Sequence, residues 1–356
     1  MSLLSGIRQK AYRIYTRAEV QESSLRYLFF EITRRCNLNC IHCGSDCTSS
    51  TSMDELTTES WLKIIDYLKQ TFDPLPLIVL TGGEPTIHRD LFVITEALKN
   101  HGFTWGMVTN GINMTESRLA KLVDEGMCSI TLSFDGDREA TSFIRNSPKA
   151  YDKILNTMTM IGHSGIDTRD AVTCVYPGNL NKLNWISDLL LEKGMNSHRL
   201  FRIFPKGRAV ENRMLEMSFD ESRQMVSWIE KNRKSYKKGG LDLTFSCEGY
   251  LPFEQDLKVR SEPFFCRSGI NIASILCDGT ITGCNNNGPD FYQGNIIQDN
   301  FATLWQDGFK EYRNKDWLKT GLCENCKEWK YCQGSSIHLR SKTMEGPEFC
   351  YIKPLS

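Results

Sequence analysis

Residues 27–43 read Tyr-Leu-Phe-Phe-Glu-Ile-Thr-Arg-Arg-Cys-Asn-Leu-Asn-Cys-Ile-His-Cys, an apolar run that leads directly into a cysteine-rich loop. The run Tyr27–Thr33 has the length and apolar content of a buried β-strand. Cys36, Cys40 and Cys43 follow with the spacing C-x3-C-x2-C. Thiolates this close together can each bind a different iron of one compact cluster. Three protein ligands would leave one iron of a four-iron cluster open to bind something else.

Zinc is the alternative metal for this loop. Structural zinc sites favour two pairs of ligands, each with C-x2–4-C spacing. The only further donors near the three cysteines are His42 and Cys47. The spacing therefore favours an iron–sulfur cluster over zinc.

Outward from this stretch, strand-like runs alternate with helical periodicity. Trp61, Ile64, Ile65 and Leu68, for example, fall at the i, i+3, i+4, i+7 positions of one helical face. Six strand–helix units predict an α/β fold with a parallel sheet, either doubly wound or curled into a barrel. The five further strand-like runs are Leu77–Leu80, Thr104–Thr109, Ser129–Phe134, Ala171–Val175 and Leu200–Phe204.

Polar and glycine-containing segments follow the predicted strands. Thr81–Pro85 follows the second strand, Thr109–Gly111 the third and Ser133–Gly136 the fourth. In parallel α/β folds, ligands bind at the carboxyl ends of the strands. We therefore expect these segments and the cysteine loop to share one site.

Composition narrows the class of protein. The 356 residues carry 43 basic and 43 acidic side chains, so net charge favours neither nucleic acid nor a membrane surface as a partner. No apolar run reaches the length of a membrane span, and residues 1–20 lack the apolar core of a secretory signal. We therefore expect a cytoplasmic protein, in which clustered cysteines are metal ligands rather than disulfides.

The fourteen cysteines are unevenly distributed. Cys128, Cys174 and Cys247 stand alone and are interpreted as small buried hydrophobic residues. From about Leu241 the alternation stops, and glycine, asparagine and cysteine become frequent. The expected organisation is an N-terminal helix over 1–24, a barrel domain over 25–215, a connecting helix over 216–240 and a cysteine-rich domain over 241–356.

The cysteine loop and Thr81-Gly82-Gly83-Glu84-Pro85, in register after two successive strands, resemble the radical S-adenosylmethionine (radical SAM) enzymes. The resemblance implies a partial (β/α)6 TIM-like barrel, a [4Fe–4S] cluster on Cys36, Cys40 and Cys43, and S-adenosylmethionine on its open iron. Glu84 would hold the cofactor ammonium, and Arg145 its carboxylate. The cofactor-binding residues that the resemblance implies are His42, Gly82, Gly83, Glu84, Asn110, Ser133, Asp135 and Arg145.

The C-terminal cysteines resemble the SPASM extension of this family, which houses up to two auxiliary iron–sulfur clusters. Cys266-x12-Gly279-x4-Cys284 matches one half of its pattern, and Cys323-x2-Cys326-x5-Cys332 with Cys350 matches the other. A zinc ribbon is the alternative for the second group. Ser336 stands where the family has a further cysteine. The expected auxiliary ligands are Cys266, Cys277, Cys284, Cys323, Cys326, Cys332 and Cys350; for Cys277, a buried strand residue is the alternative.

The resemblance implies an oxidoreductase that uses a 5′-deoxyadenosyl radical to modify a peptide or protein oxidatively. An external donor of the flavodoxin or ferredoxin type would supply the electron that reduces the barrel cluster. The auxiliary clusters would either accept an electron from the substrate radical or bind the substrate. Sulfatase maturases carry an aspartate where this chain has Asn285, which argues against that activity. Two alternatives remain: a small-molecule substrate such as a tetrapyrrole or sugar, and a non-catalytic iron–sulfur or zinc protein. The Thr81–Pro85 loop argues against the second, because a scaffold needs no methionine pocket.

Overall fold

A computed structural model describes residues 3–50 and 53–353 of the chain. Within them, one sheet of ten strands has the order β10-β9-β8-β1-β2-β3-β4-β5-β6-β7. The strands from β8 through β1 to β7 are parallel neighbours, and β9 and β10 add antiparallel pairs at one edge. The strands are β1 (Tyr27–Glu31), β2 (Leu77–Thr81), β3 (Trp105–Thr109), β4 (Met127–Ser133), β5 (Thr168–Val175), β6 (Ser197–Arg202), β7 (Asp242–Phe245), β8 (Ile272–Ile275), β9 (Thr280–Thr282) and β10 (Gly294–Asn295).

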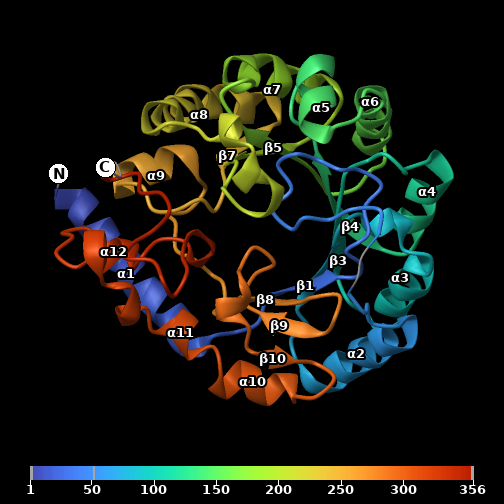
Figure 1. The fold of residues 1–356 in the computed structure, drawn as a ribbon, viewed down its shortest axis with the longest axis horizontal. Helices are drawn as coiled ribbons and strands as arrows, with labels where there is room; N and C mark the ends of the chain where they lie inside the picture. The colour runs from blue at the N-terminus through green and yellow to red at the C-terminus, as the bar shows by residue number, and fades with distance from the viewer. Residues whose placement is uncertain (1–2, 51–52, 354–356) are drawn as a thin grey trace.

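Helices follow the first strands in the predicted alternation and form an arc around the sheet (Figure 1). This confirms the predicted α/β class with a partial TIM-like barrel. The helices of the arc are α2 (Thr58–Thr71), α3 (Leu91–Asn100), α4 (Glu116–Asp124), α5 (Arg138–Arg145), α6 (Ala150–Gly162), α7 (Leu183–Glu192) and α8 (Phe219–Gly239).

Helix α2 illustrates how sequence positions these elements. The hydroxyl of Thr57 accepts a hydrogen bond from the backbone N–H of Ser60 and caps the N-terminus. Its buried face, spaced as predicted, packs on the sheet, and the rings of Trp61 and Phe30 lie 4.9 Å apart. This packing anchors β1, whose carboxyl end begins the cysteine loop.

The sheet continues into the cysteine-rich segment 241–356. Strand β7 follows α8 and pairs with β6, whereas β8 returns to the opposite edge and pairs with β1. Barrel and cysteine-rich segment therefore share one sheet. The sequence pattern does not predict β7, which has only four residues, and it suggests β8 only through the strand alternative for Cys277.

The rest of the C-terminal segment has little regular structure and lies beside helix α1 (Leu3–Glu22), on the side of the barrel that the arc leaves open (Figure 1). An aromatic group that includes Trp305, Phe309 and Tyr312 supports it. Its helices are α9 (Phe253–Val259), α10 (Phe301–Asp307), α11 (Lys310–Arg313) and α12 (Trp329–Cys332). None of the described helices is long and apolar enough to cross a membrane.

Candidate active site

A cavity of about 300 Å³ lies at the carboxyl ends of the parallel strands. Residues that follow β1 to β6 line it, as expected for ligand sites in such folds. Of the predicted site residues, those that line it are Cys36, Cys40, Cys43, His42, Gly82, Gly83, Asn110, Ser133 and Arg145.

The cysteine loop brings four thiols to this cavity, because Cys47 joins the three of the motif. A hydrogen bond with the neighbouring Cys47 lowers the pKa of Cys43. Burial instead raises the pKa of Cys36 to about 11. The apolar surroundings that disfavour a lone thiolate at Cys36 suit a thiolate bonded to iron, since the metal supplies the compensating charge.

Arg208 fixes the shape of this loop from the turn after β6. Its guanidinium donates to the carbonyl oxygens of Cys40 at 2.8 Å and Cys47 at 2.9 Å. The preceding Gly207 has φ +53°, and a side chain there would place Cβ 2.4 Å from the Cys43 carbonyl oxygen. The turn therefore rests directly on the loop, which explains the glycine–arginine pair.

Gly82 and Gly83 are required by the protein's own backbone. A Cβ atom at Gly82 would lie 2.2 Å from the carbonyl oxygen of Thr33, and one at Gly83 equally close to that of Arg35. The loop after β2 thus packs against the chain that enters the cysteine loop. Both residues also line the cavity, as predicted for cofactor-binding residues, but the close packing of the two loops already requires glycine at these positions.

Glu84 differs from its expected role. Its side chain is fully buried and is not among the cavity-lining residues. One carboxylate oxygen accepts hydrogen bonds from Thr86 and from Thr109 Oγ1 at 2.8 Å, and the other accepts one from the Asn110 N–H at 2.7 Å. Glu84 therefore ties the loops after β2 and β3 together, and its contact with a cofactor ammonium stays a prediction.

This arrangement predicts a double effect of Glu84→Gln. The amide nitrogen of glutamine donates and cannot accept, so Glu84→Gln loses either the bond from the Asn110 N–H or those from the two threonines, which destabilises the chain. If Glu84 also holds the cofactor ammonium, the lost charge-assisted bond, worth roughly 1.5–3 kcal/mol, lowers cofactor affinity by about one to two orders of magnitude, since each tenfold corresponds to about 1.4 kcal/mol. Calorimetric titration with S-adenosylmethionine measures this loss.

The free energy of unfolding separates the two roles of Glu84. A loop tie predicts that Glu84→Gln also destabilises the ligand-free chain in urea denaturation. Unchanged stability together with weaker binding would restore the direct contact with the ammonium.

Arg145 is a buried cation at the cavity wall. It forms an ion pair with the fully buried Asp135, and one Nη donates to Cys40 Sγ at 3.8 Å. Although burial opposes it, Asp135 helps to raise the pKa of Arg145, which stays protonated. Its Nε has no partner among the described residues and is available to an anionic group in the cavity. Asp135 thus orients Arg145, whereas it is not itself part of the cavity wall.

His42 and Asn110 complete the predicted set on this side. Burial lowers the pKa of His42 to about 4, so its ring is neutral, and Nδ1 lies 3.3 Å from the carbonyl oxygen of Ile144. The amide of Asn110 donates to Asn37 Oδ1 at 2.8 Å and lies 3.6 Å from Cys36 Sγ. Both residues therefore line the cavity and also make contacts that hold the cysteine loop in place.

The cavity also includes residues that the sequence analysis did not select. Cys174 follows from β5, and Phe201, Arg202 and Phe204 come from the end of β6. Their position at the carboxyl ends of predicted strands could have identified them, because ligand sites of parallel α/β folds lie there and that position identified the residues after β1 to β4. Cys174, expected to be a buried hydrophobic residue, lies at the cavity wall.

A second group of thiols lines a separate cavity in the C-terminal segment. Cys323, Cys326, Cys332 and Cys350 come together there, with Arg340 at the same wall. Burial raises the pKa of Cys332 to about 12, and the three other thiols are among its electrostatic neighbours. Four soft sulfur donors around one hollow suit an iron–sulfur cluster or zinc.

A third group differs from the predicted ligand set. Cys266 and Cys284 lie near Cys247, which the sequence pattern assigned to an apolar core. The electrostatic neighbours of Cys277 are instead Glu31, Glu55 and Asp278. Cys277 follows β8 and therefore lies near the end of β1, because the two strands are paired in parallel.

Ser336 lies beside this third group, where the sequence analysis expects a missing ligand. Its hydroxyl donates to the Cys247 carbonyl oxygen at 2.8 Å. Cys247 itself is accessible, yet desolvation by the surrounding protein raises the pKa of its thiol. Cys247, Cys266, Cys284 and Ser336 therefore form one group in this part of the chain.

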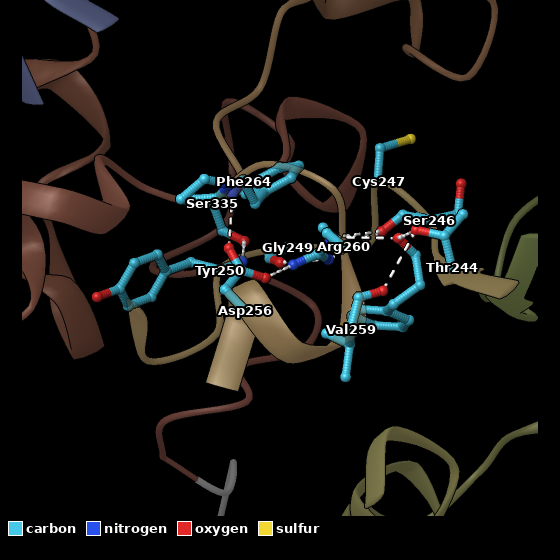
Figure 2. Close-up of polar contacts among 12 residues, drawn as sticks. Thr244, Ser246, Cys247, Gly249, Tyr250, Asp256, Val259, Arg260, Phe264 and Ser335 are labelled. Carbon is cyan, nitrogen blue, oxygen red and sulfur yellow. Dashed lines mark hydrogen bonds and ion pairs between the residues drawn. The ribbon is translucent and has the colours of Figure 1, made fainter. Parts of the chain in front are cut away.

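Arg260 shapes the loop that presents Cys247 (Figure 2). Its guanidinium forms an ion pair with Asp256 and donates to the carbonyl oxygens of Ser246 at 2.8 Å and Gly249 at 3.0 Å. Figure 2 shows the Cys247 side chain on the side of the loop that points away from Arg260. Arg260 therefore holds the backbone carbonyls on both sides of Cys247 and does not contact the Cys247 thiol.

Two family models and several known proteins match this chain. A family model described as the radical SAM superfamily matches residues 30–185, and one described as an iron–sulfur cluster-binding domain, SPASM, matches residues 266–327. An AdoMet-dependent heme synthase of Methanosarcina barkeri is 25% identical and aligns over 92% of this chain and 97% of its own. A PqqA peptide cyclase of Rhizobium meliloti is 23% identical, over 91% of this chain and 86% of its own. The crystal structure of Streptococcus suis SuiB bound to S-adenosylmethionine superposes with a TM-score of 0.68 at 15% identity, covering 89% of this chain and 75% of that one.

Proposed function

We propose that this chain, which belongs to the radical SAM superfamily and carries a C-terminal SPASM domain, is an oxidative maturase of a peptide or protein. Membership makes it a radical SAM enzyme whose cofactors are S-adenosylmethionine, a [4Fe–4S] cluster and auxiliary iron–sulfur clusters. The substrate class is the proposed part. One of the relatives described above, the PqqA peptide cyclase, is named for a peptide substrate.

The size of the barrel cavity carries this proposal. At about 300 Å³ it stands at the lower end of the range of ligand sites. S-adenosylmethionine occupies a large part of such a volume. Cluster and cofactor together would fill the cavity, which favours a substrate that presents a single side chain at its opening over a tetrapyrrole macrocycle that would have to enter it.

The residues of the cavity have separate roles in the proposed reaction. Cys36, Cys40 and Cys43 would hold the cluster, and Arg145, steadied by Asp135, would bind the cofactor carboxylate through its free Nε. When bound, cluster and cofactor supply a 5′-deoxyadenosyl radical that removes a hydrogen atom from the substrate. Phe201 and Phe204 line the cavity and exclude water from the reacting C–H bond.

The two C-terminal thiol groups would hold the auxiliary clusters. Cys323, Cys326, Cys332 and Cys350 provide four ligands for one cluster. For the other we propose Cys247 in place of Cys277, together with Cys266 and Cys284. Ser336 is a poor ligand for a soft metal site, so one iron of this cluster would be open to a substrate thiolate.

A tetrapyrrole substrate is the second candidate. The heme synthase relative, which aligns over nearly its whole length, favours it. The same residues would hold the cluster and cofactor in that case. The two candidates differ in what must enter the barrel beside the cofactor.

Mass spectrometry of reconstituted, dithionite-reduced enzyme distinguishes them. The substrates to compare are a cysteine-containing peptide encoded by a short reading frame beside the gene and an iron coproporphyrin, each supplied with S-adenosylmethionine. We expect the peptide to lose two hydrogen atoms with formation of 5′-deoxyadenosine, and the porphyrin to remain unchanged. Loss of a propionate carboxyl group from the porphyrin, with an unmodified peptide, would reverse the assignment.

A further inference from the structure

We infer that Arg340 raises the reduction potential of the cluster at Cys323, Cys326, Cys332 and Cys350, so that this cluster accepts an electron readily. The inference rests on the proposed auxiliary cluster at these four thiols. Arg340 would act through the cluster ligands, as a positioning and tuning residue.

The geometry places the guanidinium against the ligand sulfur. Arg340 follows the 3₁₀ helix Ile337–Leu339, is buried, and lines the same cavity as the four thiols. Its Nη2 donates to Cys323 Sγ at 3.2 Å, and its Nε donates to the Gly334 carbonyl oxygen at 3.0 Å. The second contact fixes the plane of the guanidinium, so the first is not a chance orientation of a mobile side chain.

Among residues 3–50 and 53–353 no aspartate or glutamate forms an ion pair with Arg340, and its buried Nη1 makes no hydrogen bond. A buried cation without an anion is strongly unfavourable. A cluster with four thiolate ligands is an anion, and its sulfur atoms accept hydrogen bonds, so it supplies what the guanidinium lacks.

Arg145 at the barrel cluster provides the contrast within the same chain. It also donates to a ligand sulfur, Cys40 Sγ, but Asp135 balances its charge. Hydrogen bonds and positive charge near cluster sulfur raise the potential, because the reduced form carries one more negative charge. The uncompensated Arg340 would therefore raise the potential of its cluster more than Arg145 does. That difference favours electron flow from a substrate radical toward the C-terminal cluster.

An EPR-monitored redox titration tests this inference. The parent for the titration carries Cys36, Cys40 and Cys43 replaced by Ala, which removes the barrel cluster. The signal to follow is the one that Cys326→Ala abolishes. We expect Arg340→Gln to make reduction of this centre at least tenfold less favourable, a shift of about 59 mV to lower potential for one electron, with iron content unchanged. Arg340→Lys, which keeps the charge but loses the planar fork, should shift it less.

Arg313→Lys is the matched control, because Arg313 lies in the same segment and donates to backbone carbonyls such as that of Gly269 at 3.1 Å. It should leave the potential unchanged. A full signal with an unmoved potential in Arg340→Gln would overturn the inference, whereas absence of the signal in the parent would refute the proposed cluster.

A second measurement does not depend on the stability of the variant. Parent protein labelled with ¹⁵N in the arginine guanidinium should show a nitrogen hyperfine coupling to the reduced centre. Its absence would overturn the inference even where Arg340→Gln fails to retain iron.

Discussion

Replacement of Cys36, Cys40 and Cys43 together by Ala should abolish cleavage of S-adenosylmethionine to 5′-deoxyadenosine and remove about four irons from the anaerobically reconstituted chain. The three thiols lie at one cavity beside the residues that would hold the cofactor. Without them no open iron remains to bind the amino and carboxylate groups of S-adenosylmethionine. Chromatography of 5′-deoxyadenosine after reduction with dithionite measures cleavage, and a colorimetric assay measures iron.

Cys128→Ala provides the control for this triple variant. Its thiol lies on β4 and contacts the Trp105 carbonyl oxygen at 3.2 Å, and it does not line the cavity. Cleavage and iron content should be retained. Cleavage at the parental rate in the triple variant would contradict the assignment of the barrel cluster to these cysteines.

Cys247→Ala should remove a whole auxiliary cluster, whereas Cys277→Ala should not. In the background without the barrel cysteines, two auxiliary clusters correspond to about eight irons. Cys247, Cys266 and Cys284 are electrostatic neighbours, so the loss of one leaves only two thiolates and about four irons in the chain. Cys277 lies beside Glu31 instead, and its replacement should leave about eight.

The reverse result, with iron lost in Cys277→Ala and kept in Cys247→Ala, would restore the ligand set expected from sequence. About four irons in the background itself would mean that the three-thiol group binds no cluster. Ser336→Cys offers a gain-of-ligand control. It should keep the iron, and it should block the change in the EPR spectrum that an added thiol produces at an open iron.

Much of the fold follows from local sequence. Alternation of apolar runs with helical faces predicted the first six strands, because each element is formed by residues close together in the chain. The ends of strands moved by a few residues: β5 begins at Thr168 and β6 ends at Arg202. Strand β7 was missed and β8 was suggested only as the alternative for Cys277, since four residues leave little pattern and the pairing of these strands depends on β6 and β1.

The barrel site was predictable to a similar extent. Short spacing alone brings Cys36, Cys40 and Cys43 together, and the parallel sheet brings Asn110, Ser133 and Arg145 to the same cavity. The partners of Glu84 were not predictable. Whether a carboxylate meets a ligand or two neighbouring loops depends on how deeply it is buried, and sequence does not report depth.

The sequence by itself determined the α/β class, the cysteine loop and the grouping of Cys323, Cys326 and Cys332, because in these features the informative residues follow one another at short spacing. The family resemblance added Cys350 to that group. Only the tertiary structure decided which thiols share the third group. Cys247 is nineteen positions before Cys266, yet it is an electrostatic neighbour of both Cys266 and Cys284 in the folded chain. The tertiary structure also brings the guanidinium of Arg340 into hydrogen-bond contact with Cys323 Sγ. Contacts between distant segments depend on packing and on the direction of each side chain, and spacing along the chain encodes neither.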